Sequence, residues 1–277
     1  MKFQLKALVA ALALVAAVPA SAAIDQAVTG NGSFVLSVWD SVANISASFD
    51  LGKTYSEFST AANASFANSG VNTAGTAFSW DLTSGDYASA WASFASVANE
   101  ANASWAITAG DNLGSGSGSR GYITTYTGAT FAALNTNGLV AGVGKFDVYV
   151  DNLGTNESLV QNHTTALNGA NTAVTSKLSY SPEFYFGGRN FGTGPMSVGT
   201  VGSSLGLVQT LTGASGVNQV TNTIYSNANG ISTFTLTSNG QLAYAAAVAA
   251  VPEPETYAML LAGLGFMGFV ARRKQAK

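Results

Sequence analysis

The 277-residue chain has only 9% charged residues, no cysteine and a single histidine. The absence of cysteine excludes disulfides, thiolate metal sites and cysteine nucleophiles. Between residues 23 and 250 we count five basic and twelve acidic residues, a net charge of −7, whereas binding to nucleic acid or anionic lipid is driven by clusters of Lys and Arg. We therefore expect the body of the protein to have no nucleic-acid partner.

The first 22 residues contain the three parts of a secretory signal peptide in the expected order. Two lysines precede an uninterrupted apolar run over residues 7–18, and small residues that include Ala20 and Ala22 follow it. We predict that signal peptidase cleaves after Ala22, so that the mature protein begins at Ala23. The alternative is a buried N-terminal helix. Cleavage implies that the protein is exported across the inner membrane.

Residues 23–250 form the predicted folded domain, in which short strands give the commonest signal. A tight turn at Ser238-Asn239-Gly240 predicts a closing hairpin, because Asn-Gly tolerates the positive φ that such turns require. Many short strands indicate a mainly β fold, sandwich or jelly-roll-like, or a barrel. Runs of β-branched and aromatic residues predict strands at residues 34–39, 45–49, 77–82, 104–109, 122–126, 146–150, 184–186 and 231–236.

Two other segments carry a helical pattern. Aromatic and aliphatic residues recur every three or four positions between residues 87 and 97, which predicts a helix over residues 87–99. A second, more polar helix is predicted over residues 157–167. The alternating Ser and Gly of residues 115–119 indicate a flexible linker. We therefore expect one or two short helices within the mainly β domain.

The sequence gives little support for catalysis. His163 is the single histidine and lies in a polar segment, and no Gly-x-Ser-x-Gly motif marks a nucleophile. A glycoside hydrolase needs two carboxylates about 5–10 Å apart, but turns and helix caps explain scattered acids equally well. We expect that the protein is not an enzyme. The alternative, a carbohydrate-active hydrolase, would use one of three pairs: Asp81 with Asp86, Asp147 with Asp151, or Glu157 with Glu183.

Two Asp-Asn pairs are the candidate metal ligands. Asp111 with Asn112, and Asp151 with Asn152, supply the oxygen atoms that Ca²⁺ prefers, although neither pair belongs to an EF-hand loop. Two Asp-initiated turns explain the same residues. We expect no cofactor, and calcium is the alternative.

The four tryptophans are candidates for stacking on sugar rings. All four fall within predicted strands or on the apolar stripe of the predicted helix, so we predict that they lie in the core. They are Trp39, Trp80, Trp91 and Trp105.

A proline-rich linker at residues 251–256 separates the domain from an apolar tail. It contains Pro252, Glu253 and Pro254, and the two prolines stop both helix and sheet and favour an extended, protease-accessible backbone. Residues 257–271 are uncharged and predict a membrane helix. At 1.5 Å per residue this helix spans about 22 Å, which is short for a hydrocarbon core of about 30 Å.

The chain ends in a basic tail at residues 272–277, which begins with Arg272, Arg273 and Lys274. The positive-inside rule places this tail in the cytoplasm and the body on the other side of the membrane. That orientation agrees with the predicted signal peptide.

The order of Pro-Glu-Pro, short apolar helix and basic cluster resembles the PEP-CTERM sorting signal. The resemblance covers residues 251–277, and a simple tail anchor is the alternative. It implies that an exosortase cleaves at or near Pro252, Glu253 and Pro254 and passes the body to the cell surface or to extracellular polysaccharide, often in bacteria that form biofilms. We therefore expect a non-enzymatic surface or extracellular-matrix protein with exopolysaccharide as a partner, anchored by its C-terminal helix only before processing.

Overall fold

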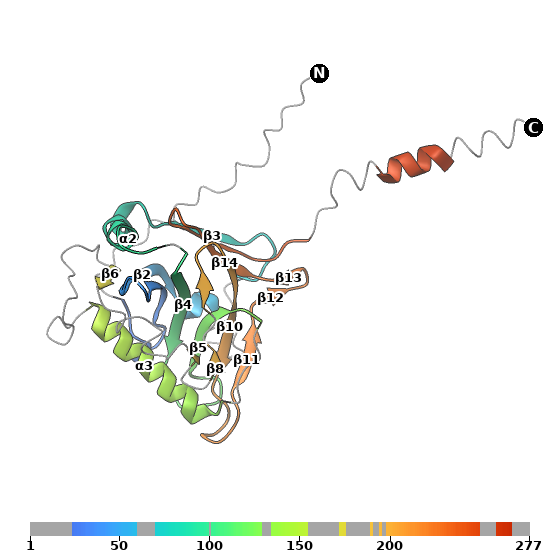
Figure 1. Ribbon diagram of the computed structural model, residues 1–277. Helices are drawn as coiled ribbons and strands as arrows, with labels where there is room; N and C mark the ends of the chain where they lie inside the picture. Colours follow the sequence, from blue (N-terminus) through green and yellow to red (C-terminus); the bar gives the residue numbers. More distant parts are fainter. Residues whose placement is uncertain are drawn as a thin grey trace, which may run out of the picture. The chain divides into compact units, whose positions relative to one another are not determined.

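A computed structural model of the chain (Figure 1) describes residues 24–59, 70–99, 101–128, 134–154, 172–175, 189–190, 194–195, 198–249 and 259–267. The chain divides into two compact units, Met1–Ala247 and Val248–Lys277. All the described strands belong to the first unit.

Eleven described strands of the first unit form one antiparallel sheet. Their order is β3-β15-β14-β10-β5-β4-β1-β2-β6, with β11 paired to β10 and β9 paired to β4. Their bounds are β1 Ser33–Asp40, β2 Ile45–Thr54, β3 Ala77–Asp81, β4 Ala103–Asp111, β5 Gly121–Tyr126, β6 Thr172–Thr175, β9 Gly199–Thr200, β10 Ser204–Leu211, β11 Thr221–Ile224, β14 Thr233–Leu236 and β15 Gln241–Ala245.

Two short pairs of strands stand apart from this sheet: β12 (Ser226–Asn227) with β13 (Gly230–Ile231), and β7 (Arg189–Asn190) with β8 (Gly194–Pro195). The prediction of a mainly β fold is confirmed. A sandwich or jelly roll would divide the strands between two facing sheets, whereas here the main sheet is single and nearly closed.

Strand β1 is an interior strand of the sheet and is buried on both faces. All eight of its residues are buried, and alternate side chains enter two different apolar clusters. Phe34, Leu36 and Val38 belong to the larger cluster, while Val35 and Trp39 belong to the smaller one. The period-2 alternation of a strand therefore contributes to two cores at once.

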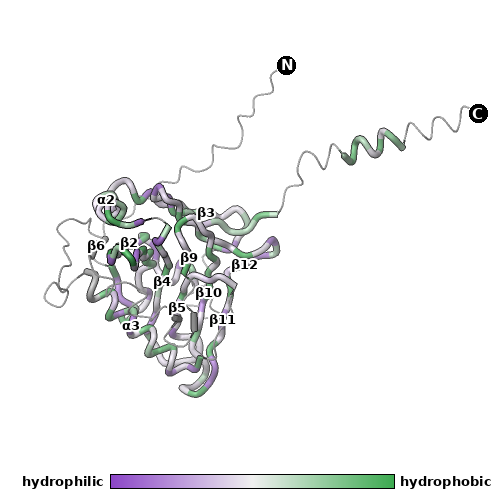
Figure 2. The backbone as a smooth tube through the Cα atoms, viewed as in Figure 1, coloured by the Kyte–Doolittle hydropathy of each residue, from purple (hydrophilic) through white to green (hydrophobic). Residues whose placement is uncertain are grey.

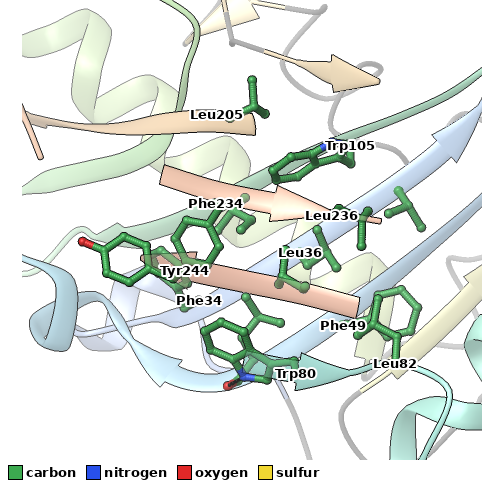
Figure 3. Packing of buried hydrophobic residues seen from close by; sticks show 14 of the residues in the cluster. Phe34, Leu36, Phe49, Trp80, Leu82, Trp105, Leu205, Phe234, Leu236 and Tyr244 are labelled. Carbon is green, nitrogen blue, oxygen red and sulfur yellow. Dashed lines mark hydrogen bonds between the residues drawn. The ribbon is translucent and has the colours of Figure 1, made fainter. Parts of the chain in front are cut away.

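The larger core lies inside the curved sheet and is rich in aromatic side chains (Figure 3). Phe58, from the one-turn helix α1 (Tyr55–Phe58), is fully buried within it. Its ring stacks on Phe34 with centroids 4.2 Å apart and meets the edges of Tyr244 at 5.4 Å and Phe78 at 5.7 Å. A capping box between Thr54 and Glu57 stabilises the start of the helix that carries Phe58.

The prediction of a strand at residues 146–150 is wrong, because these residues lie in the helix α3 (Thr136–Gly154). Leu139, Val143, Phe146 and Val150 recur every three or four positions and are buried in the smaller core. The helical period therefore prevailed over the β-branched composition of this run. With 19 residues, α3 is also longer than the short helices that we expected.

A buried hydroxyl group links α3 to the sheet. The Tyr149 hydroxyl lies 2.5 Å from Ser37 Oγ in β1 and 2.6 Å from Ser48 Oγ in β2, and all three residues are buried. Since a buried hydroxyl without a partner is costly, these contacts fix the position of the helix on the two strands.

Side chains span the gap between β3 and β2, where backbone pairing does not close the sheet. Trp80 Nε1 of β3 donates a 2.7 Å hydrogen bond to the Leu51 carbonyl of β2, and the Tyr87 hydroxyl donates one of 2.6 Å to the Asp50 carbonyl. Lys53 Nζ also lies 4.8 Å from the centroid of the Phe78 ring. These contacts satisfy carbonyl groups that a further strand would otherwise bind.

The remaining predicted elements are mostly confirmed. Strands at residues 34–39, 45–49, 77–82, 104–109 and 122–126 correspond to β1, β2, β3, β4 and β5, and the hairpin around Asn239 corresponds to β14 and β15. The helix predicted over 87–99 is shorter, with η3 (Gly85–Tyr87) leading into α2 (Ala88–Ala95). Strand β10 was missed. The strand predicted at 184–186 and the helix at 157–167 lie outside the described residues.

The loop at residues 115–119, predicted to be a flexible linker, connects β4 to β5 and is held by hydrogen bonds. The Gly118 amide donates to the Thr212 carbonyl at 2.8 Å, and Ser119 Oγ donates to the Gly116 carbonyl at 2.6 Å. This loop is therefore part of the folded unit, where it joins two paired strands.

We predict that Gly110→Ala lowers the free energy of unfolding by about 1–3 kcal/mol. A Cβ atom at Gly110 would lie 2.9 Å from Ala27 Cβ in η1 (Ala27–Thr29) and 3.1 Å from Val143 Cγ1 in α3, so both elements would have to move away from β4. Urea unfolding followed by circular dichroism measures the loss. Gly116→Ala is the matched control, because a Cβ there meets no atom within 4 Å; equal stability of the two variants would contradict the prediction.

Candidate functional site

The folded body ends at Ala247, directly after β15. The Ala246 amide donates a 2.9 Å hydrogen bond to the Thr76 carbonyl. Asn227 Nδ2 donates to the Ala247 carbonyl at 2.8 Å and also to the Asn72 carbonyl at 2.8 Å. Val248, which follows, is 61% exposed and belongs to the second unit.

The described part of the second unit that lies beyond residue 249 is a nine-residue helix at residues 259–267. It lies within the helix predicted at 257–271, and it is apolar along its length in Figure 2. Among the described residues, no helix is long and apolar enough to cross a membrane. The large side chains of the helix at residues 259–267 are each more than half exposed: Met259, Leu260, Leu261, Leu264, Phe266 and Met267.

A family model for the PEP-CTERM protein-sorting motif matches residues 250–274. The chain is a PEP-CTERM domain-containing protein. The motif marks a protein that an exosortase sorts, and it implies export and sorting to the cell surface. The match is confined to the tail and starts three residues after Ala247. No curated protein and no solved structure matches the chain.

The residues predicted to form the PEP-CTERM signal fall within this match. They are Pro252, Glu253, Pro254, Arg272, Arg273 and Lys274. Their positions in space lie outside the described residues, as do those of Ala20, Ala22 and Ala23 at the predicted signal-peptide cleavage site.

The first candidate calcium pair has a structural role in a loop. Asp111 Oδ2 accepts a 2.9 Å hydrogen bond from the Asn31 amide, and Asp111 Oδ1 accepts one of 2.8 Å from the Leu113 amide. Burial raises the pKa of Asp111, and the two amides partly offset this effect. Asn112 donates its backbone amide to the Ala27 carbonyl, while its Oδ1 is buried with no partner among the described residues.

The second candidate pair lies in regular helix instead of a turn. Asp151 and Asn152 occupy the last turn of α3, and their side chains lie outside the described residues. Throughout the described part of the chain, no three His, Asp or Glu side chains are grouped closely enough to hold a metal ion.

Two of the acids proposed for hydrolysis, Asp81 and Asp147, accept hydrogen bonds from other parts of the fold. Asp81 Oδ1 accepts hydrogen bonds from the Thr83 hydroxyl, the Thr83 amide and Gln241 Nε2. The hydroxyl and the amide of Thr83 hold the pKa of Asp81 below its ordinary value, whereas a general acid needs a raised pKa. Asp147 Oδ1 accepts from the Val28 amide at 3.0 Å and so ties η1 to α3.

The other catalytic candidates lie outside the described residues: Glu157, His163 and Glu183.

All four tryptophans are buried, as predicted, with at most 8% of each residue exposed. Trp105 Nε1 donates to the Thr200 carbonyl at 3.0 Å, and Trp39 lies in the smaller core beside α3. The described tryptophans therefore form no platform on which a sugar ring would stack.

Asp40 closes the β1–β2 turn and accepts hydrogen bonds from three backbone amides. Its Oδ1 accepts hydrogen bonds from the Val42 and Ala43 amides, and its Oδ2 accepts one of 2.7 Å from the Asn99 amide. Burial raises the pKa of Asp40, but the three amides outweigh burial and hold this pKa below its ordinary value. The carboxylate therefore stabilises the fold above pH 4, and this contribution is lost as the pH falls through the lowered pKa.

We predict that Asp40→Asn lowers the free energy of unfolding at pH 7 by about 1–3 kcal/mol, because its Nδ2 would face the Asn99 amide, a second donor. The variant should also lose less stability than the wild type between pH 4 and pH 2, since it has no carboxylate to protonate. Urea unfolding at a series of pH values measures both effects. Asp86→Asn, on the exposed η3 turn, is the control, and an unchanged pH profile for Asp40→Asn would argue against this role.

Asn227, which binds the last residue of the folded body, is a residue that the sequence did not single out. Its two partners lie 155 and 20 positions away in the sequence. No sequence pattern indicates that the side-chain amide of Asn227 reaches the end of the folded body.

Proposed function

We propose that this is a non-enzymatic surface or extracellular-matrix protein, released from its membrane tail by an exosortase. The observation that carries the proposal is the PEP-CTERM motif at residues 250–274. Before processing, the apolar segment holds the protein in the inner membrane with Arg272, Arg273 and Lys274 in the cytoplasm. Cleavage at or near Pro252, Glu253 and Pro254 then passes the body to the cell surface or to exopolysaccharide.

The chemistry of the body supports a structural role in a polysaccharide matrix. Residues 23–250 carry few charges and many Ser, Thr, Asn and Gly side chains, which form hydrogen bonds with hydroxyl groups without requiring a counterion. The described acids Asp40, Asp81 and Asp111 accept hydrogen bonds from backbone amides and so act in turns and loops.

Intact-mass analysis of the protein from its own host tests the proposed processing. We expect an N-terminus near Ala23 and a C-terminus near Pro254. A mature species that still carries Arg272 and Arg273 would refute exosortase cleavage. Fractionation of the same culture tests the location, because we expect the body with the cell surface or the extracellular polysaccharide. Hydrolysis of that polysaccharide by the purified body, lost on a single Asp or Glu substitution, would instead identify an enzyme.

A further inference from the structure

At the end of the folded body, the side-chain amide of Asn227 has hydrogen bonds at both its nitrogen and its oxygen. Asn227 Nδ2 donates to Asn72 O and to Ala247 O, each at 2.8 Å. Its Oδ1 accepts from the Asn229 amide at 2.8 Å. The Asn229 side chain also reaches the Ala247 carbonyl, at 3.5 Å. Asn227 therefore joins three segments: the loop at Asn72, its own hairpin and the chain end.

The loop at Asn72, to which Asn227 donates a hydrogen bond, is itself bonded to residues of the larger core. The Tyr244 hydroxyl donates to the Val71 carbonyl at 3.1 Å, and Ser232 Oγ donates to Asn72 Oδ1 at 3.4 Å. Tyr244 and Val71 are both fully buried members of that core. The hydrogen bond to Ala247 is thus the last in a connected series that runs from the core to the end of the folded body. Breaking it requires local unfolding of the exit, the place where the chain leaves the body.

This arrangement limits the free chain that precedes the sorting motif. Four residues, 248–251, separate Ala247 from Pro252. A fully extended chain advances at most 3.3–3.6 Å per residue, so the five steps from Ala247 to Pro252 span at most about 18 Å. A protease binds several extended residues around the bond that it cuts, and folded backbone held by hydrogen bonds resists cleavage. Little free chain is therefore left over for an enzyme that acts at Pro252.

We propose that Asn227 is a positioning residue for sorting, which fixes Ala247 and so defines the shortest linker that the processing enzyme accepts. The proposal rests on cleavage at or near Pro252, Glu253 and Pro254. We call the hydrogen bond from Asn227 to the Ala247 carbonyl the clamp. Without the clamp, the residues that follow β15 would detach from the body, and the linker before Pro252 would lengthen. Loss of the clamp should change the rate of processing most when the linker is short. A general effect on folding would change the rate whatever the length of the linker.

The test uses the full chain in its own host, with pulse-chase labelling and intact mass to measure loss of the tail. Deletion of residues 248–249 leaves the matched motif intact. We expect this deletion to slow processing about tenfold or more, because cleavage then depends on opening of the exit. Asn227→Ala with Asn229→Ala should restore the rate in the deletion background and leave it unchanged with the natural linker.

Asn222→Ala is the matched control, because Asn222 accepts a 2.7 Å hydrogen bond from Thr210 in β10, away from the exit; it should not restore the rate. Resistance of the body to limited trypsin digestion shows that each variant is folded. Wild-type processing of the deletion, or a failure of the double substitution to restore it, overturns the role of Asn227 while sorting stands. A wild-type protein that keeps its tail overturns the proposed cleavage as well.

Discussion

Phe58→Ala is expected to lower the free energy of unfolding of the body by about 3–5 kcal/mol, the largest loss that we predict for a single residue. The ring is fully buried and packs against Phe34, Phe78 and Tyr244, with centroids 4.2, 5.7 and 5.4 Å away. These partners come from β1, β3 and β15, so truncation opens a cavity where distant strands of the sheet meet. Urea unfolding of residues 23–249 measures the loss.

Two variants make the Phe58 experiment specific. Phe58→Leu keeps most of the apolar volume and should cost less than about 1.5 kcal/mol. Val217→Ala, at a side chain that is 80% exposed, should change the stability by less than about 0.5 kcal/mol. A loss for Phe58→Ala no greater than that for Val217→Ala would mean that the ring does not hold the sheet together.

Phe58 also illustrates how far the sequence alone predicts this fold. The alternation at residues 34–39 predicts a strand, and β1 confirms it. The same alternation does not reveal that Val35 and Trp39 are covered by α3, because that depends on a helix about a hundred residues away. Phe58 lies outside every predicted element, since four residues of helix give no periodic signal.

The failure at residues 146–150 has a similar cause. A short run of β-branched and aromatic residues is compatible with either a strand or a buried helix, and only the longer period from Leu139 onwards separates the two. Burial of Phe146 and Tyr149 against the sheet stabilises the helix that has this period. Tertiary packing therefore decided the local structure, as it often does for residues of intermediate propensity.

The sorting signal was predictable because it is a linear motif. Proline, apolar length and terminal charge act through the chain itself and require no contact with the body. The clamp at the chain end is the opposite case, because Asn227 acquires its role only when the fold brings Asn72 and Ala247 to its amide.

Replacement of Pro252, Glu253 and Pro254 together by alanine is expected to abolish release of the tail while leaving the stability of the body unchanged. The two effects separate because the matched motif begins at residue 250, beyond Ala247, where the hydrogen bonds of the body end. Without the prolines, the linker also loses the restriction to extended backbone that a protease requires. We expect a precursor that stays with the membrane and retains Arg272 and Arg273 by intact mass.

Gln275→Ala is the matched control for the triple substitution, because residue 275 follows the matched segment; it should be processed at the wild-type rate. Thermal unfolding of the body should give the same midpoint for all three proteins. Loss of the tail from the triple variant at the wild-type rate would show that Pro-Glu-Pro is not the recognised sequence. A lowered midpoint would show instead that the body extends past Ala247, which would also remove the basis for a clamp at Asn227.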